Sequence, residues 1–257
     1  MDGHISNTLN KKLMMECNNL GVVQLESGRF VEATQCFTAA LDFMKSILDQ
    51  EIHSPSPTTI VGNCSTPTSN SRANQSQACR VRVCAPTANP AIPPNQDHEI
   101  SLHPASSSPD YVFQSPIYFS EEALINNRLP LANLVLSLLF NLALSHHSIA
   151  MQDPTATHSL QPALLHYLLA FSVQVQHGID LSSIHTLGLI NNVSQLLNCM
   201  GDKERAQRCF EYLLSSLMLL VDQSRGHLEP PVMRLVERLV QNAACAVLGS
   251  SSTAQAA

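Results

Sequence analysis

Apolar side chains recur at helical spacing along most of the chain, with one long interruption between residues 51 and 118. From about Leu9 to Gln24, and again from Phe30 to Leu48, apolar positions return every three or four residues. This is the pattern of an amphipathic helix. Similar stretches follow at 131–151, around 163–170, at 181–221 and from Pro230 onward. The pattern therefore predicts an all-α fold.

One arrangement of residues occurs twice with the same spacing. An Asn pair is followed by a Gly, a small Ala and a Cys-Phe pair: Asn18-Asn19, Gly28, Ala33 and Cys36-Phe37 in the first copy, and Asn191-Asn192, Gly201, Ala206 and Cys209-Phe210 in the second. A Gly supplies the backbone conformation that ends a helix, and a small residue lets two antiparallel helices approach closely. An internal repeat of this kind predicts stacked helix pairs.

The first copy resembles the tetratricopeptide repeat (TPR), a 34-residue pair of helices. The places of that pattern are filled by Leu20, Gly21, Gly28, Phe30, Ala33, Phe37 and Ala40. Two positions depart from it, because Cys17 and Gln24 stand where the repeat usually has Trp and Tyr. The resemblance implies an α-solenoid of about three repeats: one pair in residues 1–50, and two further pairs plus a C-terminal capping helix in residues 119–248. The second pair would carry an enlarged loop between residues 152 and 162.

The interruption at 51–118 has the composition of a disordered insertion. Ten of the fifteen prolines fall between residues 51 and 116, among Ser, Thr, Asn and Gln. Such a segment cannot bury enough apolar surface to offset the entropy lost on ordering. Its end is an exception, because Tyr111-Val112-Phe113 and Ile117-Tyr118-Phe119 are aromatic and are expected to dock. One hypothesis is that they occupy a groove of the solenoid. Residues 249–257 are predicted to be a flexible tail.

The resemblance also implies where a ligand would bind. TPR stacks usually hold an extended peptide in a concave groove lined by the first helix of each pair. Alignment of the three units places Asn19, Asn141 and Asn192 at one equivalent groove position. A carboxamide donates and accepts together, so such a row can bind the backbone of an extended chain. The alternative is that these amides bond within the stack and fix helix contacts. The full candidate groove comprises Asn18, Asn19, Val22, Phe140, Asn141, Leu144, His147, Asn191, Asn192, Gln195 and Asn198.

None of the candidate groove positions is basic. TPR modules that capture acidic chaperone tails use Lys and Arg there, so an acidic ligand is not expected. A neutral groove with apolar contributions favours an unidentified protein ligand, a peptide or helix with apolar anchors. The predicted function is therefore a protein-interaction adaptor or scaffold.

Composition and motifs argue against several other functions. A formal net charge of −6 with 13% charged residues gives no electrostatic footprint for nucleic acid. No phosphate-binding loop or catalytic motif is present, and His146 and His147 are adjacent, so they point about 100° apart on a helix and cannot share one ion. We expect no catalytic residues, cofactor or metal. Two alternatives stay open: a self-associating structural protein, and an enzyme of helical-bundle type.

Five Ser-Pro or Thr-Pro sites lie in the insertion and are candidates for a proline-directed kinase: Ser54, Ser56, Thr66, Ser108 and Ser115. Ser, Thr and Pro also co-occur in linkers without any such role. No secretory signal pattern stands at the start, and the run from Leu129 to Leu144 is interrupted by polar residues and Pro130. These features favour an intracellular protein, cytoplasmic or nuclear, without a transmembrane segment.

Overall fold

The computed structural model describes residues 2–53, 112–120, 130–153, 155–178, 184–224 and 227–254. Within these ranges the regular structure is helical and contains no strand, which confirms the all-α prediction for this part of the chain. The helices are α1 (Asp2–Glu26), α2 (Phe30–His53), α4 (Leu131–Gln152), α5 (Leu160–Gln176), α6 (Ile184–Cys199), α7 (Lys203–Gln223) and α8 (Pro230–Ala254), with a short 3₁₀ turn, η1 (Thr157–Ser159), before α5.

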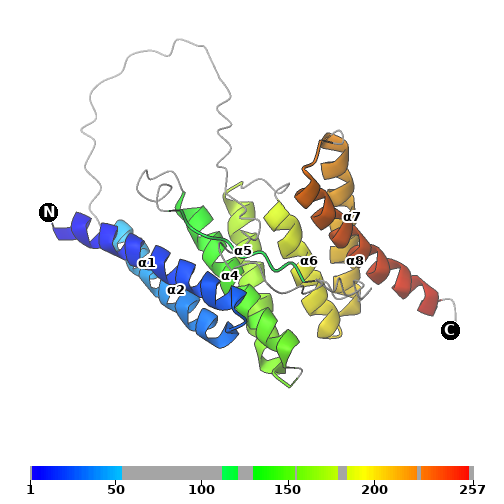
Figure 1. The fold of residues 1–257 in the computed structure, drawn as a ribbon, viewed down its shortest axis with the longest axis horizontal. Helices are drawn as coiled ribbons and strands as arrows, with labels where there is room; N and C mark the ends of the chain where they lie inside the picture. Colours follow the sequence, from blue (N-terminus) through cyan, green and yellow to red (C-terminus); the bar gives the residue numbers. More distant parts are fainter. Residues whose placement is uncertain are drawn as a thin grey trace, which may run out of the picture.

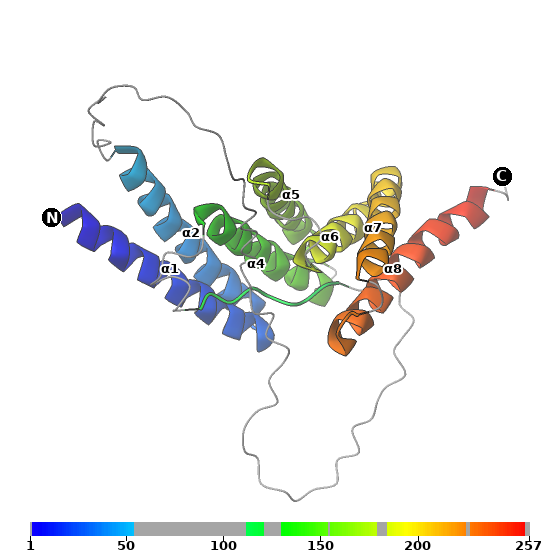
Figure 2. The same ribbon diagram turned by 90° about the horizontal axis from the view of Figure 1, so that it is seen from above.

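The helices pack in consecutive pairs. Helix α1 packs on α2, α4 on α5, and α6 on α7, and the pairs are joined by contacts of α2 with α4 and of α5 with α6. Helix α8 then packs on α7 and also touches α6. Figures 1 and 2 show the result as a row of helices that follows chain order from one end of the molecule to the other.

Two of the three pairs turn through the same hydrogen-bonded motif. At the end of α1, Arg29 N–H donates to the Gln24 carbonyl at 2.9 Å and Gly28 N–H to the Leu25 carbonyl at 3.0 Å. At the end of α6, Asp202 and Gly201 make the corresponding bonds to Leu197 and Asn198, also at 2.9 and 3.0 Å. Gly28 and Gly201 have φ of 74° and 83°, the left-handed conformation that this cap requires. The repeated Gly in the sequence is therefore a repeated helix stop.

The second helix of each pair presents a large ring after a small Ala, and in the first two pairs a second Ala follows it. The rings are Phe37, Tyr167 and Phe210, each at most 1% exposed. The residues four before and three after them are also buried: Ala33 and Ala40, Ala163 and Ala170, Ala206 and Leu213. In the first pair the ring packs on Gly21, where an added Cβ would lie 2.6 Å from Phe37 Cε1. The rings thus fill the space between the paired helices.

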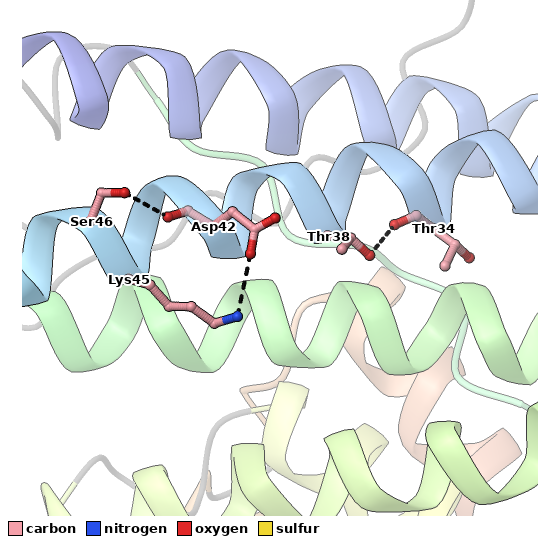
Figure 3. Close-up of polar contacts among 5 residues, drawn as sticks. All are labelled: Thr34, Thr38, Asp42, Lys45 and Ser46. Carbon is pink, nitrogen blue, oxygen red and sulfur yellow. Dashed lines mark hydrogen bonds and ion pairs between the residues drawn. The ribbon is translucent and has the colours of Figure 1, made fainter.

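Helix α2 carries several short-range polar contacts. Figure 3 shows Thr38 bonded to the Thr34 carbonyl, Ser46 bonded to the Asp42 carbonyl and Lys45 paired with Asp42. Each contact stays within about one turn of the helix. Thr34 also bonds to Ser145 of α4, at 2.9 Å, and so links the first pair to the second.

Helix α4 is the most apolar of the described helices. Among them it alone is long and apolar enough to cross a bilayer, but 61% of its apolar window is buried against the rest of the fold. That degree of burial is typical of a core helix.

Three predicted boundaries differ from the structure. Helix α2 continues to His53, beyond the expected limit at residue 50, and α8 continues to Ala254, into the segment expected to be a tail. Residues 112–118, at the end of the expected disordered insertion, have a defined place against the helices and bury Val112, Phe113 and Ile117. The remainder of the insertion, 54–111, lies outside the described residues, as do 255–257.

The packing of Phe37 gives a stability prediction. Phe37→Ala should lower the free energy of unfolding by about 3–5 kcal/mol, because the ring is fully buried and its removal leaves a cavity. Val31→Ala on the same helix is the matched control, since Val31 is 58% exposed and its loss should cost less than about 0.5 kcal/mol. Urea denaturation followed by circular dichroism measures both, and equal losses would contradict the packing described.

Candidate functional site: an asparagine row

Residues 112–120, the strap, form an extended segment that lies across the first helices of the three pairs. Figures 1 and 2 show it crossing α1 and α4 toward α6. It contacts residues up to 100 positions away in the sequence. The aromatic end of the insertion is therefore docked on the fold.

Three asparagines, the asparagine row, hold the strap backbone. In each contact the side-chain Oδ1 accepts from a strap N–H and the side-chain Nδ2 donates to the carbonyl of the same strap residue. Asn192 of α6 binds Phe113 at 2.7 and 3.0 Å. Asn141 of α4 binds Ile117 at 2.8 Å for both bonds. Asn19 of α1 binds Phe119 at 2.9 Å for both bonds. The three helices thus contribute one equivalent amide each.

Two bonds to one residue require an extended backbone. The N–H and C=O of a residue in an extended chain point to the same side, and those of the next residue point to the opposite side. The bound residues Phe113, Ile117 and Phe119 are separated by even numbers, so all three face the asparagine row. Pro116 has no N–H, and it falls at a position whose N–H would point away from the row. The strap sequence is therefore compatible with this contact along its whole length.

The Asn-Asn pair that repeats in the sequence has a common structure. In each pair the first Asn donates to Oδ1 of the second at 3.2 Å, which orients the amide that holds the strap. Oδ1 of the first Asn accepts from an Asn of the next first-type helix: Asn18 from Asn141 at 2.9 Å, and Asn191 from Asn242 of α8 at 2.6 Å. Asn18 also donates to the Ile117 carbonyl at 3.1 Å. The amides form two hydrogen-bonded groups, one on α1 and α4 and the other on α6 and α8, and both bind the strap.

Apolar side chains of the strap enter the core on the same side. Phe113 is fully buried, and its ring meets Phe140 and His185 edge-on, with ring centroids 6.1 and 5.9 Å apart. Ile117 belongs to the same core cluster. Phe119 joins a second cluster, built with Met14, Met44 and Leu138. The three backbone-bound residues are thus also buried apolar anchors, and Val112 at the start of the strap is buried with them.

Gly188 makes room for the first anchor. A Cβ at this position would overlap the ring of Phe113. Helix α6 therefore passes the strap at a place where only glycine fits, and the Phe113 ring lies against its backbone.

The opposite side of the strap is more exposed. Gln114 is exposed, Pro116 and Tyr118 are half-buried, and the Tyr118 hydroxyl donates to Glu26 Oε2 at 2.7 Å. Side-chain alternation in an extended chain accounts for this difference between the two sides.

The remaining residues of the predicted groove have different environments in the structure. Asn191 and Gln195 link α6 to α8 through Asn242, with Gln195 donating to Asn242 Oδ1 at 2.7 Å. Val22 and Leu144 are core residues, and Asn198 is exposed near the end of α6. Asn191 and Gln195 fix helix contacts, whereas Asn19, Asn141 and Asn192 bind an extended segment of the protein's own chain.

Two histidines, the buried His147 and the half-buried His185, are held neutral. His147 packs edge-on against Tyr167, and neither of its ring nitrogens has a hydrogen-bond partner in the described part of the chain. Burial lowers the pKa of His147 from 6.5 to about 4, and burial likewise lowers the pKa of His185 to about 4. Burial raises the pKa of Tyr167, whose hydroxyl accepts from Asn192 Nδ2 at 2.9 Å. His146 is separate from this group and stacks on His166, with ring centroids 5.7 Å apart.

Four candidate phosphorylation sites, Ser54, Ser56, Thr66 and Ser108, lie outside the described residues. Ser115 lies in the strap between two backbone-bound residues. No group of three or more His, Cys, Asp or Glu side chains suited to a metal ion occurs within the described ranges.

Sequence reasoning did not single out Gly188, His185 or Asn242. Gly188 and His185 lie one to two turns before the Asn pair of α6, outside the repeated pattern. Asn242 could have been found from its place on α8, a helix that takes the position of a further first helix.

The chain matches no protein-family model, no curated protein and no solved structure with which it was compared. Its resemblance to the TPR therefore depends on the residues named above.

The amide network gives a prediction for Asn141. Asn141→Leu keeps the side-chain size but leaves the Ile117 N–H and Asn18 Oδ1 without this partner, at about 1–3 kcal/mol for each buried group left unsatisfied. The Ile117 carbonyl keeps its hydrogen bond from Asn18. We expect a clear loss of unfolding free energy by urea denaturation. Asn198→Leu on the exposed end of α6 is the control and should change stability by less than about 0.5 kcal/mol. A neutral result for Asn141→Leu would mean that the amide does not hold the strap.

The buried histidines predict a pH dependence. Their folded-state pKa of about 4 lies below the unfolded value of 6.5, so between these values the unfolded chain binds protons that the folded chain does not. Stability should therefore fall as the pH is lowered from about 6.5 toward 4, by up to about 1.4 kcal/mol per pH unit for each histidine. His147→Leu should reduce this slope in urea titrations at pH 7.5, 6 and 5. An unchanged slope would contradict the assignment of His147.

Proposed function

We propose that the chain is a TPR-like α-solenoid of about three repeats, capped by α8, and that it acts as a non-catalytic protein-interaction adaptor inside the cell. Its groove, formed by α1, α4 and α6, would bind an extended peptide. Support for the repeat assignment comes from the paired packing, the matching helix caps at Gly28 and Gly201, and the buried ring four residues after an Ala in each second helix.

One observation carries the binding function. The asparagine row makes two hydrogen bonds to the backbone of each of three residues in an extended segment. These bonds use no side chain of the bound segment, so they would hold any extended chain that can present its backbone. Backbone hydrogen bonds of this kind supply affinity, and pockets for particular side chains supply specificity.

The ligand class follows from the anchors. Specificity would come from apolar side chains at three positions of the bound segment, spaced i, i+4 and i+6, where the strap has Phe113, Ile117 and Phe119. Helices α4 and α6 contain no Asp, Glu, Lys or Arg, so a charged ligand side chain would find no partner on them. A helical ligand is disfavoured, because its N–H and C=O groups already bond to each other. The proposed partner is therefore a protein with an extended segment carrying aromatic or aliphatic anchors.

The strap is the resident ligand of this groove. A segment tethered to its own site has an effective concentration that reaches millimolar for a short flexible linker. A partner would therefore have to compete with residues 112–120, or bind after they leave. The proposed adaptor is autoinhibited by its own chain.

A peptide experiment tests the proposal. The probe is a fluorescent peptide of residues 110–121, and the protein is the full chain with Phe113→Ala and Ile117→Ala, which weaken the resident strap but keep its backbone. Fluorescence anisotropy should show binding to this variant and much less to the wild type. Addition of Asn141→Leu to the variant should abolish the binding.

Methylated peptides separate backbone from side-chain recognition. N-methylation at Ile117 removes the N–H that faces Asn141 and should weaken binding about tenfold to a hundredfold, whereas N-methylation at Gln114 removes one that points away and should have little effect. If the double variant does not fold, protease sites can be inserted into residues 54–111 and 121–129 of the wild type. Cleavage at both sites frees the strap from the chain, so that it can exchange with the fluorescent peptide. Failure of the probe to bind either form, or equal effects of the two methyl groups, would overturn the proposal.

A further inference from the structure

Ser115 occupies a distinctive place in the strap. It lies between Phe113, which Asn192 of α6 holds, and Ile117, which Asn141 of α4 holds. Its side chain shares the side of Phe113 and Ile117 by strand alternation, and it is half-buried. Ser115 precedes Pro116, and a residue before proline favours the extended conformation that the strap adopts.

The surroundings of Ser115 suit a hydroxyl and do not suit an anion. The two helices that hold its neighbours, α4 and α6, have no Lys or Arg among their residues. His185 packs against the ring of Phe113, two residues before Ser115, and burial lowers its pKa so that it stays neutral. Farther along the strap, Tyr118 donates to the carboxylate of Glu26, which is a negative charge. A phosphate on Ser115 would lose water and would find no Lys or Arg on α4 or α6.

We propose that Ser115 is a phosphorylation site that switches the groove between its occupied and open states. A proline-directed kinase would transfer the γ-phosphoryl group of ATP to Ser115 Oγ. The Oγ–P bond forms as the bond from phosphorus to the leaving ADP oxygen breaks, and the hydroxyl proton passes to the kinase base. The added charge of about −1.5 to −2 then disfavours the docked strap. This inference depends on the proposed function, because the open groove is what a partner would bind.

The switch also has a direction. While the strap is docked, its backbone is bonded to the asparagine row and its apolar anchors are buried, so a kinase cannot bind it as an extended substrate. Phosphorylation therefore requires transient release, and the phosphate then opposes return of the strap. Binding of a partner to the open groove and phosphorylation of Ser115 should favour one another, since both act on the released state.

Amide hydrogen exchange on the full chain tests this switch. Phosphoserine is incorporated by codon suppression at position 115. In the matched control it is incorporated at position 114 in place of Gln, so that the same charge lies one residue away on the exposed side of the strap. Exchange at the Phe113 and Ile117 amides should accelerate at least about tenfold in the first protein and little in the control. The amides of α7 should stay protected in both, since the asparagines that hold the strap lie on α1, α4 and α6.

Each other outcome counts against the switch. Unchanged protection at Phe113 and Ile117 would show that the groove accepts the phosphate. Equal release of the strap in both phosphorylated proteins would show that a charge at either position weakens docking, and that the effect is not specific to Ser115. Loss of protection in α7 as well would show that the strap cannot leave without unfolding the protein. The peptide experiment on unphosphorylated variants decides the proposed function separately, so failure of one does not imply failure of the other.

Discussion

The pairing of a carboxamide with both polar groups of one backbone residue is the interaction on which the described structure depends. It occurs three times, on α1, α4 and α6, and it joins three helix pairs to one extended segment. Each buried amide and each buried strap peptide would lose hydrogen bonds without the other. The row can therefore remain buried and polar only while an extended chain such as the strap is bound to it.

This constraint explains features that otherwise look unrelated. The repeated Asn-Asn pairs are needed because the first Asn orients the second and bonds to the next helix. Glycine stands at position 188 because the ring of Phe113 lies against the helix backbone. Proline stands at position 116 because the N–H there would face away from the row. Helix α8 closes the network at its end, where Asn242 bonds to Asn191 and Gln195.

Much of the fold could be predicted from the sequence, because helix periodicity, glycine caps and small residues around Phe37 and Phe210 are local signals. Alignment of the three units predicts that Asn19, Asn141 and Asn192 are equivalent. In the structure all three side chains bind the strap. The roles of the other predicted groove residues could not be predicted from the alignment. Asn191 and Gln195 depend on where Asn242 of α8 lies, and His147 is buried by Tyr167 of another helix. The bounds of the insertion were also missed, since the apolar anchors at its end gain their order from helices far away in the sequence.

The central claim is that residues 112–120 belong to the folded structure through their backbone. Hydrogen exchange of the unmodified full chain at neutral pH measures this directly, at the amides of Phe113, Ile117 and Phe119. The account predicts that these three amides exchange much more slowly than that of Gln114, which points away from the asparagine row. Uniformly fast exchange along the strap, at the rate of an unfolded peptide, would contradict it.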